Sequence, residues 1–250
     1  MINNPPGSIL KKKDGFNPHS IEWSNELTQR LWDYYSTSDA HRSTYFGETA
    51  GKHFVRVLRR NGVLRGRRNI VDISCGTGAI IEALLAVTPE GCKVMGFDLS
   101  ELSVERTNTR NKNSRNFSGA FLGAGYPMSI DNASVDLLIL TEVVEHLDDS
   151  ALQLLLLDCR RVLAPGGVLV LTTPNEEDLS RGHVLCPECG CTFHRWQHCR
   201  SWSKASLSGA LLQAGFCDVK VRPITWGNEF INFAFVILGR KHTGLLALAA

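Results

Sequence analysis

The sequence predicts an α/β fold: a doubly wound, mostly parallel sheet of seven strands with a helical cap before it and an insertion rich in Cys and His. Of the 250 residues, 43% are hydrophobic and 21% are charged, a globular balance that excludes a disordered chain. From Asn69 onward, short apolar runs alternate with helical patterns, as they do in βαβ units. Residues 175–202 fit neither period, and a connection of that length inside a domain is usually functional or held by a metal.

The elements follow one another in a simple order. Residues 1–20 form a polar, flexible leader, and residues 21–62 carry apolar side chains at helical spacing, which predicts a cap of two or three helices. Residues 63–240 form the main domain, into which the segment 175–202 is inserted as a lid, and residues 241–250 are a tail. The seven strands are expected at Ile70 to Ile73, Lys93 to Phe97, Ser118 to Leu122, Val135 to Leu140, Gly167 to Thr172, Cys217 to Val221 and Phe233 to Leu238. Helices are expected between them at residues 79–87, 102–110, 148–163 and 203–214.

Charge and hydropathy exclude other classes of protein. The formal net charge is only +2, so the whole chain gives no reason to expect nucleic acid. The longest apolar stretches are far shorter than the roughly 20 residues that a membrane span needs. The N-terminus lacks the apolar core of a signal peptide, so we expect a cytoplasmic protein without a membrane partner.

One group of basic residues leaves two interpretations open. It suits an RNA-binding face or a solvated helix face, and we favour the second because no aromatic side chains interleave with the basic ones. The group consists of Lys52, Arg56, Arg59, Arg60, Arg65, Arg67 and Arg68.

A glycine turn follows the first strand of the main domain. Gly76 and Gly78 let the backbone approach a ligand closely, and the helix after them offers free N–H groups. Asp98 ends the next strand, where a carboxylate can accept hydrogen bonds from two ribose hydroxyls. A tight structural turn and a helix cap are the simpler interpretations. A nicotinamide dehydrogenase is excluded because Ile81 stands where its third glycine belongs.

Over residues 45–239 the chain resembles the class I S-adenosylmethionine-dependent methyltransferases. The segment Val71 to Gly78 is similar to their first motif, Asp98 to their ribose-binding acid, and Leu163 to Gly167 to the turn before their fifth strand. Tyr126-Pro127 and Ser134 to Asp136 resemble their approach to the fourth strand. The resemblance implies a Rossmann-like fold that binds S-adenosyl-L-methionine. It implies a cofactor site of Asp72, Ser74, Cys75, Gly76, Gly78, Asp98, Leu99, Gly123, Ala124 and Thr141.

Two positions depart from that pattern. Ser74 stands where the first glycine is usual, and Gly123-Ala124-Gly125 stands where an acidic residue often contacts the adenine amino group. Without that acid, recognition of adenine would depend on backbone groups and apolar contacts.

An acid–histidine motif follows the fourth strand. Glu142, Glu145 and His146 occupy positions i, i+3 and i+4, so a helical turn would place them on one face. Such a set suits a hard divalent metal or a general base tuned by carboxylates. A solvated first turn, with acids near the positive end of a helix dipole, is the simpler alternative.

The same motif resembles two groups of metal-dependent methyltransferases. These are the quinone-biosynthesis O-methyltransferases and the small-RNA 3′-terminal 2′-O-methyltransferases. In the RNA group a later His, with Trp four residues on, completes the metal site after a Thr-Pro-Asn turn. Thr173-Pro174-Asn175, then His198 and Trp202, follow that pattern here. The resemblance implies a site for Mg²⁺ or Mn²⁺ formed by Glu142, Glu145, His146 and His198.

The lid contains a knuckle-shaped pair of thiols. Cys186 and Cys189 can bind one tetrahedral zinc, with His194 or Cys191 as the first candidates to complete the site and His183 or Cys199 as further ones. No second Cys-x-x-Cys pair is present, so reduced cysteines in a mobile lid are the alternative. A zinc here would be structural and would hold the lid over the cofactor pocket.

Taken together, these motifs predict an enzyme that methylates an oxygen of a small molecule such as a sugar, quinone or natural product. His146 is the candidate base or metal ligand, and Glu142 and Glu145 would orient it or share the metal. Trp32, Tyr35, Tyr45 and Phe46 of the cap could line the acceptor pocket. Methylation of an RNA 3′ end is the second hypothesis. The third, a zinc-held interaction module without catalysis, has only Ser74 and Gly123 in its favour.

Overall fold

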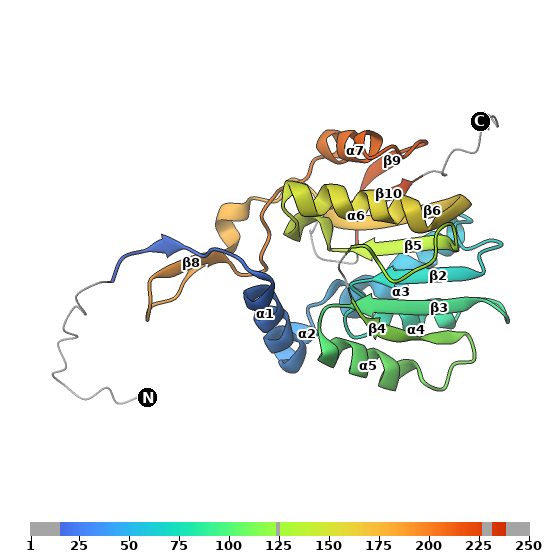
Figure 1. Ribbon diagram of the computed structural model, residues 1–250, viewed down its shortest axis with the longest axis horizontal. Helices are drawn as coiled ribbons and strands as arrows, with labels where there is room; N and C mark the ends of the chain where they lie inside the picture. The colour runs from blue at the N-terminus through green and yellow to red at the C-terminus, as the bar shows by residue number, and fades with distance from the viewer. Residues whose placement is uncertain (1–15, 124–125, 227–231, 239–250) are drawn as a thin grey trace.

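The computed structural model describes residues 16–123, 126–226 and 232–238 (Figure 1). Its large sheet has the strand order β4-β3-β2-β5-β6-β10-β9. The five strands from β4 to β6 in this order are parallel to one another, and β10 runs antiparallel to both β6 and β9. The strands are β2 (Asn69–Ile73), β3 (Lys93–Asp98), β4 (Phe117–Leu122), β5 (Val135–Thr141), β6 (Leu163–Pro174), β9 (Lys220–Thr225) and β10 (Asn232–Leu238).

Helices cover both faces of this sheet, and each face has its own core. The helices are α1 (Asn25–Thr37), α2 (Asp39–Arg42), α3 (Phe46–Arg60), α4 (Ala79–Leu85), α5 (Glu101–Asn111), α6 (Asp149–Val162) and α7 (Lys204–Gln213), with short 3-10 turns η1 (Val144–His146) and η2 (Leu179–Gly182). Leu155 of α6 and Leu207 of α7 belong to one buried cluster, and Phe54 of α3 and Ile81 of α4 to the other. The predicted α/β fold with a mostly parallel sheet is confirmed.

Strand β9 lies at a different place in the sequence from the strand that we predicted there. The structure puts β9 at Lys220–Thr225, whereas the sequence indicated a strand from Cys217 to Val221. The observed strand contains Pro223, which cannot donate to a sheet ladder. At the edge of a sheet this loss costs nothing, since one side of the strand has no partner, and β9 is an edge strand.

A second, three-stranded sheet projects from one end of the large one (Figure 1). It consists of β1 (His19–Ser20), β8 (Cys191–His194) and β7 (His183–Leu185), in that spatial order. The Cys- and His-rich segment is thus partly a β-hairpin, although its sequence shows no strand period. His19 and Ser20, which the sequence places in the leader, pair in parallel with Cys191 and Thr192.

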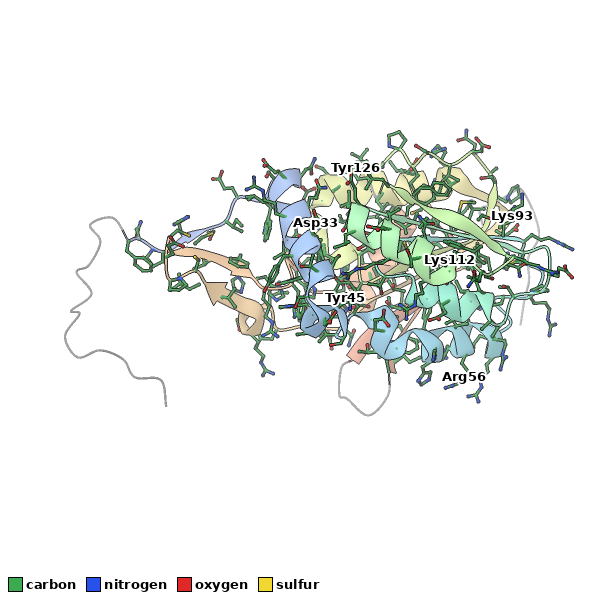
Figure 2. All side chains as sticks on the ribbon, turned by 90° about the horizontal axis from the view of Figure 1, so that it is seen from below. Asp33, Tyr45, Arg56, Lys93, Lys112 and Tyr126 are labelled. Carbon is green, nitrogen blue, oxygen red and sulfur yellow. The ribbon has the colours of Figure 1, made fainter. Side chains whose placement is uncertain are left out.

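The carboxyl ends of the parallel strands face α1 and the small sheet (Figure 1). Figure 2 shows Asp33 of α1 and Tyr45 at this end, whereas Lys93, which begins β3, lies at the opposite end. In open α/β sheets, ligands bind beyond the carboxyl ends of the strands. Within the described ranges, no helix has the length and apolar character needed to cross a bilayer.

Candidate active site

The glycine turn joins β2 to α4 in a strained conformation. Ser74, Gly76 and Gly78 all have positive φ angles, of 58°, 54° and 77°. Ser74 therefore carries a side chain in backbone geometry that usually favours glycine. A Cβ at Gly78 would lie only 2.8 Å from side-chain atoms of Thr107 and Asn111, so no larger residue fits there.

Two acids lie beneath this turn. Asp98 accepts hydrogen bonds from the backbone N–H groups of Gly76 (2.8 Å) and Ser100 (2.9 Å). Asp72 is fully buried, and neither of its carboxylate oxygens has a hydrogen-bond partner. Burial, and then the charge of Asp98, raise the pKa of Asp72 well above its usual value. A buried acid without partners favours a cationic group nearby, such as the ammonium or sulfonium of S-adenosylmethionine.

The remaining predicted cofactor residues lie around the same strand ends. The backbone N–H of Cys75 bonds to the carbonyl of Phe97, and Leu99 is 45% exposed. Thr141 is buried at the end of β5. Ala124 lies outside the described residues.

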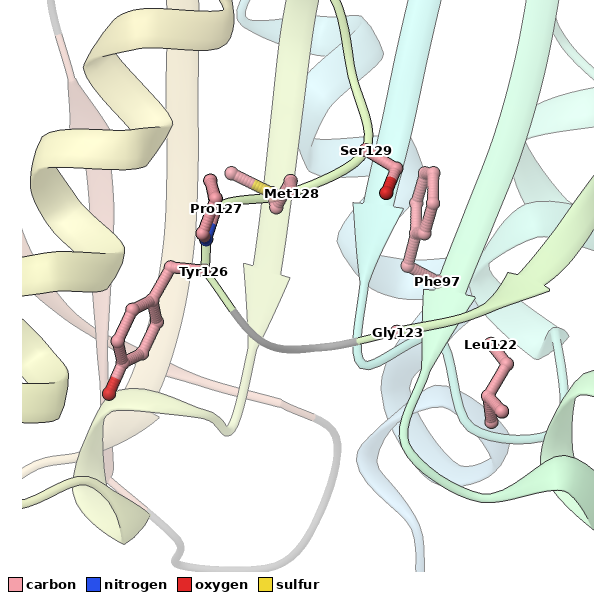
Figure 3. A pocket seen from close by; sticks show the side chains of 7 residues that line it. All are labelled: Phe97, Leu122, Gly123, Tyr126, Pro127, Met128 and Ser129. Carbon is pink, nitrogen blue, oxygen red and sulfur yellow. The ribbon is translucent and has the colours of Figure 1, made fainter.

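A cavity of about 180 Å³ lies at the carboxyl ends of β3 and β4 (Figure 3). Figure 3 shows Phe97 and Leu122 on one side of it and Tyr126 with Pro127 on the other. Its lining is Phe97, Leu122, Gly123, Tyr126, Pro127, Met128 and Ser129. No acidic side chain belongs to this lining, so a flat heterocycle would meet apolar surfaces, backbone groups and the hydroxyl-bearing side chains of Tyr126 and Ser129 there.

The acid–histidine motif forms a buried cluster rather than a solvated turn. Glu142 adopts a positive φ of 56°, and the 3-10 turn η1 carries Glu145 and His146. Glu145 is only 1% exposed. Thr172 donates to Glu142 (2.6 Å) and Thr173 to Glu145 (2.8 Å), so the end of β6 holds both carboxyl groups.

Burial sets the protonation of this cluster. It raises the pKa of Glu142 to about 8 and that of Glu145 well above its usual value. It lowers the pKa of His146 to about 3, and the neighbouring His198 acts in the same direction. Glu145 Oε1 and His146 Nδ1 are buried without hydrogen-bond partners. A divalent cation would supply the missing partner and the missing positive charge.

The structure brings His198 to this cluster from a distant part of the chain. Glu145, His146 and His198 offer ligand atoms that all lie within 4.8 Å of one another. The rings of His146 and His198 are 4.8 Å apart. The bridge between Asn175 and Trp202, which closes the lid segment at its base, explains why residues so far apart in sequence meet.

The helical cap covers the cluster. The Trp32 ring lies 5.1 Å from that of His146, and its Nε1 donates to Gln197 Oε1 at 2.9 Å. Tyr45 lies over the glycine turn, since a Cβ at Gly76 would be 3.5 Å from its ring. Phe46 packs in the core instead.

A second cavity, of about 450 Å³, lies between the cap and the lid, and both contribute residues to its wall. Tyr35 and His41 stack there with 4.5 Å between ring centroids, and Trp196 meets Tyr35 edge-on at 5.2 Å. The Arg195 guanidinium lies 5.4 Å from the centre of the Trp196 ring. The cavity is lined by Tyr35, Ala40, His41, Thr44, Val184, Phe193, Arg195 and Trp196.

Three of the four candidate zinc ligands, Cys186, Cys189 and Cys191, lie close enough to shift one another's thiol pKa, whereas His194 lies apart from them. Backbone N–H groups of Cys189 and Glu188 bond to the Cys186 sulfur and lower the pKa of that thiol. In the described part of the chain, however, the groups of three ligand atoms within 4.8 Å contain no cysteine. His194 lies instead with Glu177 and His198, because it ends β8 at the base of the hairpin.

Comparison with known proteins identifies the family. A family model described as a methyltransferase domain matches residues 24–221. The chain belongs to this methyltransferase family. The match confirms the resemblance to class I S-adenosylmethionine-dependent methyltransferases that the glycine turn, Asp98 and the turn before β6 indicate.

Curated relatives of this methyltransferase agree with the assignment. It is 31% identical over 151 residues to a Mycolicibacterium smegmatis protein named "Probable S-adenosylmethionine-dependent methyltransferase", with 60% of this chain and 52% of that protein covered. It is 29% identical over 187 residues to a ubiquinone biosynthesis O-methyltransferase of Bradyrhizobium, with 68% and 64% covered. The chain spans about half the length of the first curated relatives it matches.

Solved structures share the fold of this methyltransferase. The 1,6-didemethyltoxoflavin N1-methyltransferase of Burkholderia thailandensis, solved with 1,6-didemethyltoxoflavin and S-adenosylhomocysteine, has a TM-score of 0.65 at 15% identity, with 90% of this chain and 94% of that chain covered. Phosphoethanolamine N-methyltransferase 2 of Haemonchus contortus, solved with S-adenosyl-L-methionine, has a TM-score of 0.67 at 15% identity, with 88% and 61% covered. At these identities the likeness concerns the fold.

Sequence reasoning missed two residues of the cluster. Glu177, whose carboxylate reaches His198, lies in a run of acids and amides with no period to distinguish it. Gln197 bridges the lid to the cap by bonding to Trp32 and to Thr28. Its positive φ of 60° was not visible in the sequence.

Proposed function

We propose that this methyltransferase transfers a methyl group from S-adenosylmethionine to a hydroxyl oxygen of a small molecule, with a divalent cation at Glu142, Glu145, His146 and His198. The observation that supports this most strongly is the buried cluster itself. The carboxyl group of Glu145 meets the imidazoles of His146 and His198 beyond the carboxyl end of β5, with unpartnered atoms on Glu145 and His146. Glu142 lies outside this group of three, but close enough for its charge to raise the pKa of Glu145. Structural ion pairs do not explain it, because no Lys or Arg neutralises the acids in the described contacts.

The residues fit a hard cation such as Mg²⁺ or Mn²⁺. Carboxylate and imidazole donors suit these ions, and no thiol belongs to the set. When bound, the cation would polarise the acceptor hydroxyl and favour its deprotonation. Thr172 and Thr173 hold the two carboxyl groups in place.

His146 suits the role of a ligand better than that of a base. With a pKa near 3 its imidazole is neutral at physiological pH and keeps a lone pair available, but it accepts a proton poorly. Trp32 packs edge-on against this ring and limits its movement.

On the cofactor side, we assign the glycine turn and Asp98 to S-adenosylmethionine. Asp98 would accept hydrogen bonds from the ribose hydroxyls, and the unpartnered Asp72 would face the cationic part of the cofactor. The cavity at Phe97 and Gly123 would take the adenine ring.

The cavity between cap and lid is our candidate for the acceptor. Tyr35 in its wall contacts Trp32, with ring centroids 5.8 Å apart, and Trp32 in turn contacts His146. A volume of about 450 Å³ suits a small molecule, since ligand pockets usually measure about 300–1,000 Å³.

Methylation of an RNA 3′ end is the second candidate. Its support is the position of His198, four residues before Trp202, inside the cluster. We place it second because of where the basic residues lie. They belong to α3 and to the loop that follows it, and this loop ends at Asn69, the first residue of β2. The acid–histidine cluster lies beyond the other end of the strands, so RNA bound to the basic residues would lie far from it.

The test of the proposed function combines cation binding with activity. Electron paramagnetic resonance should show about one Mn²⁺ bound per chain, and Glu142→Ala should lose it. With methyl-tritiated cofactor and a panel of phenols, catechols and sugars, EDTA should abolish labelling and Mg²⁺ or Mn²⁺ should restore it. If labelling survives EDTA and the wild-type protein binds no Mn²⁺, the proposed cation site is wrong. The alternative, in which His146 is a base that needs no metal, would then be favoured.

A further inference from the structure

Glu177 lies between two imidazoles, outside the proposed ligand set. Its Oε2 is 2.6 Å from His198 Nδ1, and its Oε1 is 3.8 Å from His194 Nε2. It follows the end of β6 by three residues, and its side chain is 25% exposed. Glu177, His194 and His198 therefore also satisfy the distance expected of a metal site.

Hydrogen bonding argues against a second cation there. The backbone N–H of His198 donates to His194 Nδ1 at 3.0 Å, so a neutral His194 carries its proton on Nε2. That nitrogen is buried without a hydrogen-bond partner, and a protonated nitrogen cannot be a metal ligand. The carboxylate of Glu177 lies 3.8 Å from this nitrogen, so the positive end of the His194 N–H is close to a negative charge.

The same reasoning determines which ring nitrogen of His198 carries the proton. A carboxylate only accepts hydrogen bonds, so the 2.6 Å contact requires His198 to carry a proton on Nδ1. A neutral ring then has its lone pair on Nε2, and this atom is the one left to join Glu145 and His146. The His194 ring stacks on His198 at 4.7 Å, with 22° between the planes, which restricts rotation of the His198 ring.

We propose that Glu177 is a positioning residue that holds His198 in the Nδ1–H tautomer and presents its Nε2 to the cation site, with His194 supporting Glu177. The inference rests on the proposed cation site. A carboxylate behind a ligating His fixes its tautomer and orientation and increases its basicity, and loss of such a partner typically weakens metal binding by about 10- to 100-fold.

The first test needs no metal. Nitrogen-15 NMR of the histidine rings in the metal-free protein, with His198→Gln to assign the signal, should show His198 protonated on Nδ1 and His194 on Nε2. A His198 protonated on Nε2 overturns the proposal.

The second test measures Mn²⁺ affinity by electron paramagnetic resonance. Glu177→Gln should weaken binding by about tenfold or more. Glu176→Gln is the matched control, because it removes the same charge from the adjacent exposed residue and should bind as wild type does. Equal affinity of Glu177→Gln and wild type overturns the role of Glu177 while the cation site stands. Wild-type protein that binds no Mn²⁺ overturns the proposed cation site and this inference with it. If Glu177→Gln fails to fold, the tautomer of wild-type His198 still decides.

Discussion

At the scale of single residues, Asp98 holds the glycine turn to the end of β3. Its carboxylate already accepts two backbone N–H groups, which orient it at the end of β3. Asp136 accepts two backbone N–H groups as well, from Arg68 and Asn69, but at the opposite end of the sheet. Each acid therefore accepts two backbone N–H groups, and Asp136 lies far from the proposed cofactor site.

We predict that Asp98→Ala weakens binding of S-adenosylhomocysteine at least tenfold in titration calorimetry. Each charge-assisted hydrogen bond to a ribose hydroxyl is worth roughly 1.5–3 kcal/mol. Asp136→Ala should lose comparable stability but keep its affinity. Unchanged affinity in a folded Asp98→Ala protein would remove the acid from the cofactor site.

The residues of the acid–histidine cluster could be predicted from the sequence, but their environment could not. Spacing identified Glu142, Glu145 and His146, and the predicted helical turn proved to be a positive-φ residue followed by a 3-10 turn. The burial of Glu145 depends on Thr173 and the lid, which are distant in sequence. Glu177 was missed for the same reason, since its role depends on two histidines that approach only in the folded chain.

At the scale of elements, an ion pair joins α3 to α5 beside the glycine turn. Glu48 of α3 accepts hydrogen bonds from Arg110 of α5 (2.5 Å) and from the Thr77 hydroxyl in the glycine turn (2.5 Å). Although burial raises the pKa of Glu48, the bonds from Arg110 and Thr77 outweigh it and leave that pKa below its usual value. The ionised acid thus holds α3 against the glycine turn.

We predict that Glu48→Gln lowers Tm by about 2–4 °C at pH 7, equivalent to about 1 kcal/mol of unfolding free energy. The folded pKa is lower than the unfolded one, so this stability is present above the unfolded value of 4.5 and is lost as pH falls through the folded value. The difference in Tm between wild type and variant should therefore vanish in acid.

The control for that experiment is Glu26→Gln. Glu26 pairs with Arg30 one turn away on α1, and both side chains are about 70% exposed, so the exchange should change Tm little at any pH. An equal loss from both variants would mean that the contacts of Glu48 with Arg110 and Thr77 add nothing beyond a surface charge.

The β7–β8 hairpin carries the zinc hypothesis. We predict about one equivalent of zinc in purified protein and its loss from Cys186→Ser/Cys189→Ser, measured by elemental analysis. Cys199→Ser should keep the metal, because the Cys199 sulfur lies 3.1 Å from the Leu147 carbonyl at the other end of the lid. Zinc missing from wild type, or retained by the double variant, refutes the hypothesis.

Periodicity located most elements of the large sheet, and it failed where the backbone follows tertiary contacts. The strands β2 and β5 coincide with apolar runs, since both faces of a central parallel strand are buried. The pairing of β1 with β8 had no such signal. It consists of two residue pairs and of backbone bonds such as that from the His19 N–H to the Gly190 carbonyl, which do not depend on side-chain pattern.

At the scale of the whole molecule, the basic residues and the acid–histidine cluster lie at different ends of the large sheet. The basic group sits on α3 and on the loop that leads into β2, where Arg67 bonds to the backbone carbonyls of Val63 and Gly166. The acid–histidine cluster lies beyond the carboxyl ends of the strands, beside α1. A nucleic acid bound to the basic group would approach the sheet from the amino ends of its strands.

This separation predicts a small-molecule acceptor whose binding depends little on salt. A single-stranded RNA that contacts three phosphates would bind about 20-fold more weakly when salt rises from about 50 to about 200 mM, because counterion release gives a slope of about −0.7 per phosphate. The Michaelis constant for the best acceptor of the labelling panel should instead stay constant over that range. Short RNA duplexes with methyl-tritiated cofactor should remain unlabelled under the same conditions. Labelled RNA with a steep salt dependence would reverse the order of the two candidates, and it would assign the 450 Å³ cavity to a terminal nucleoside.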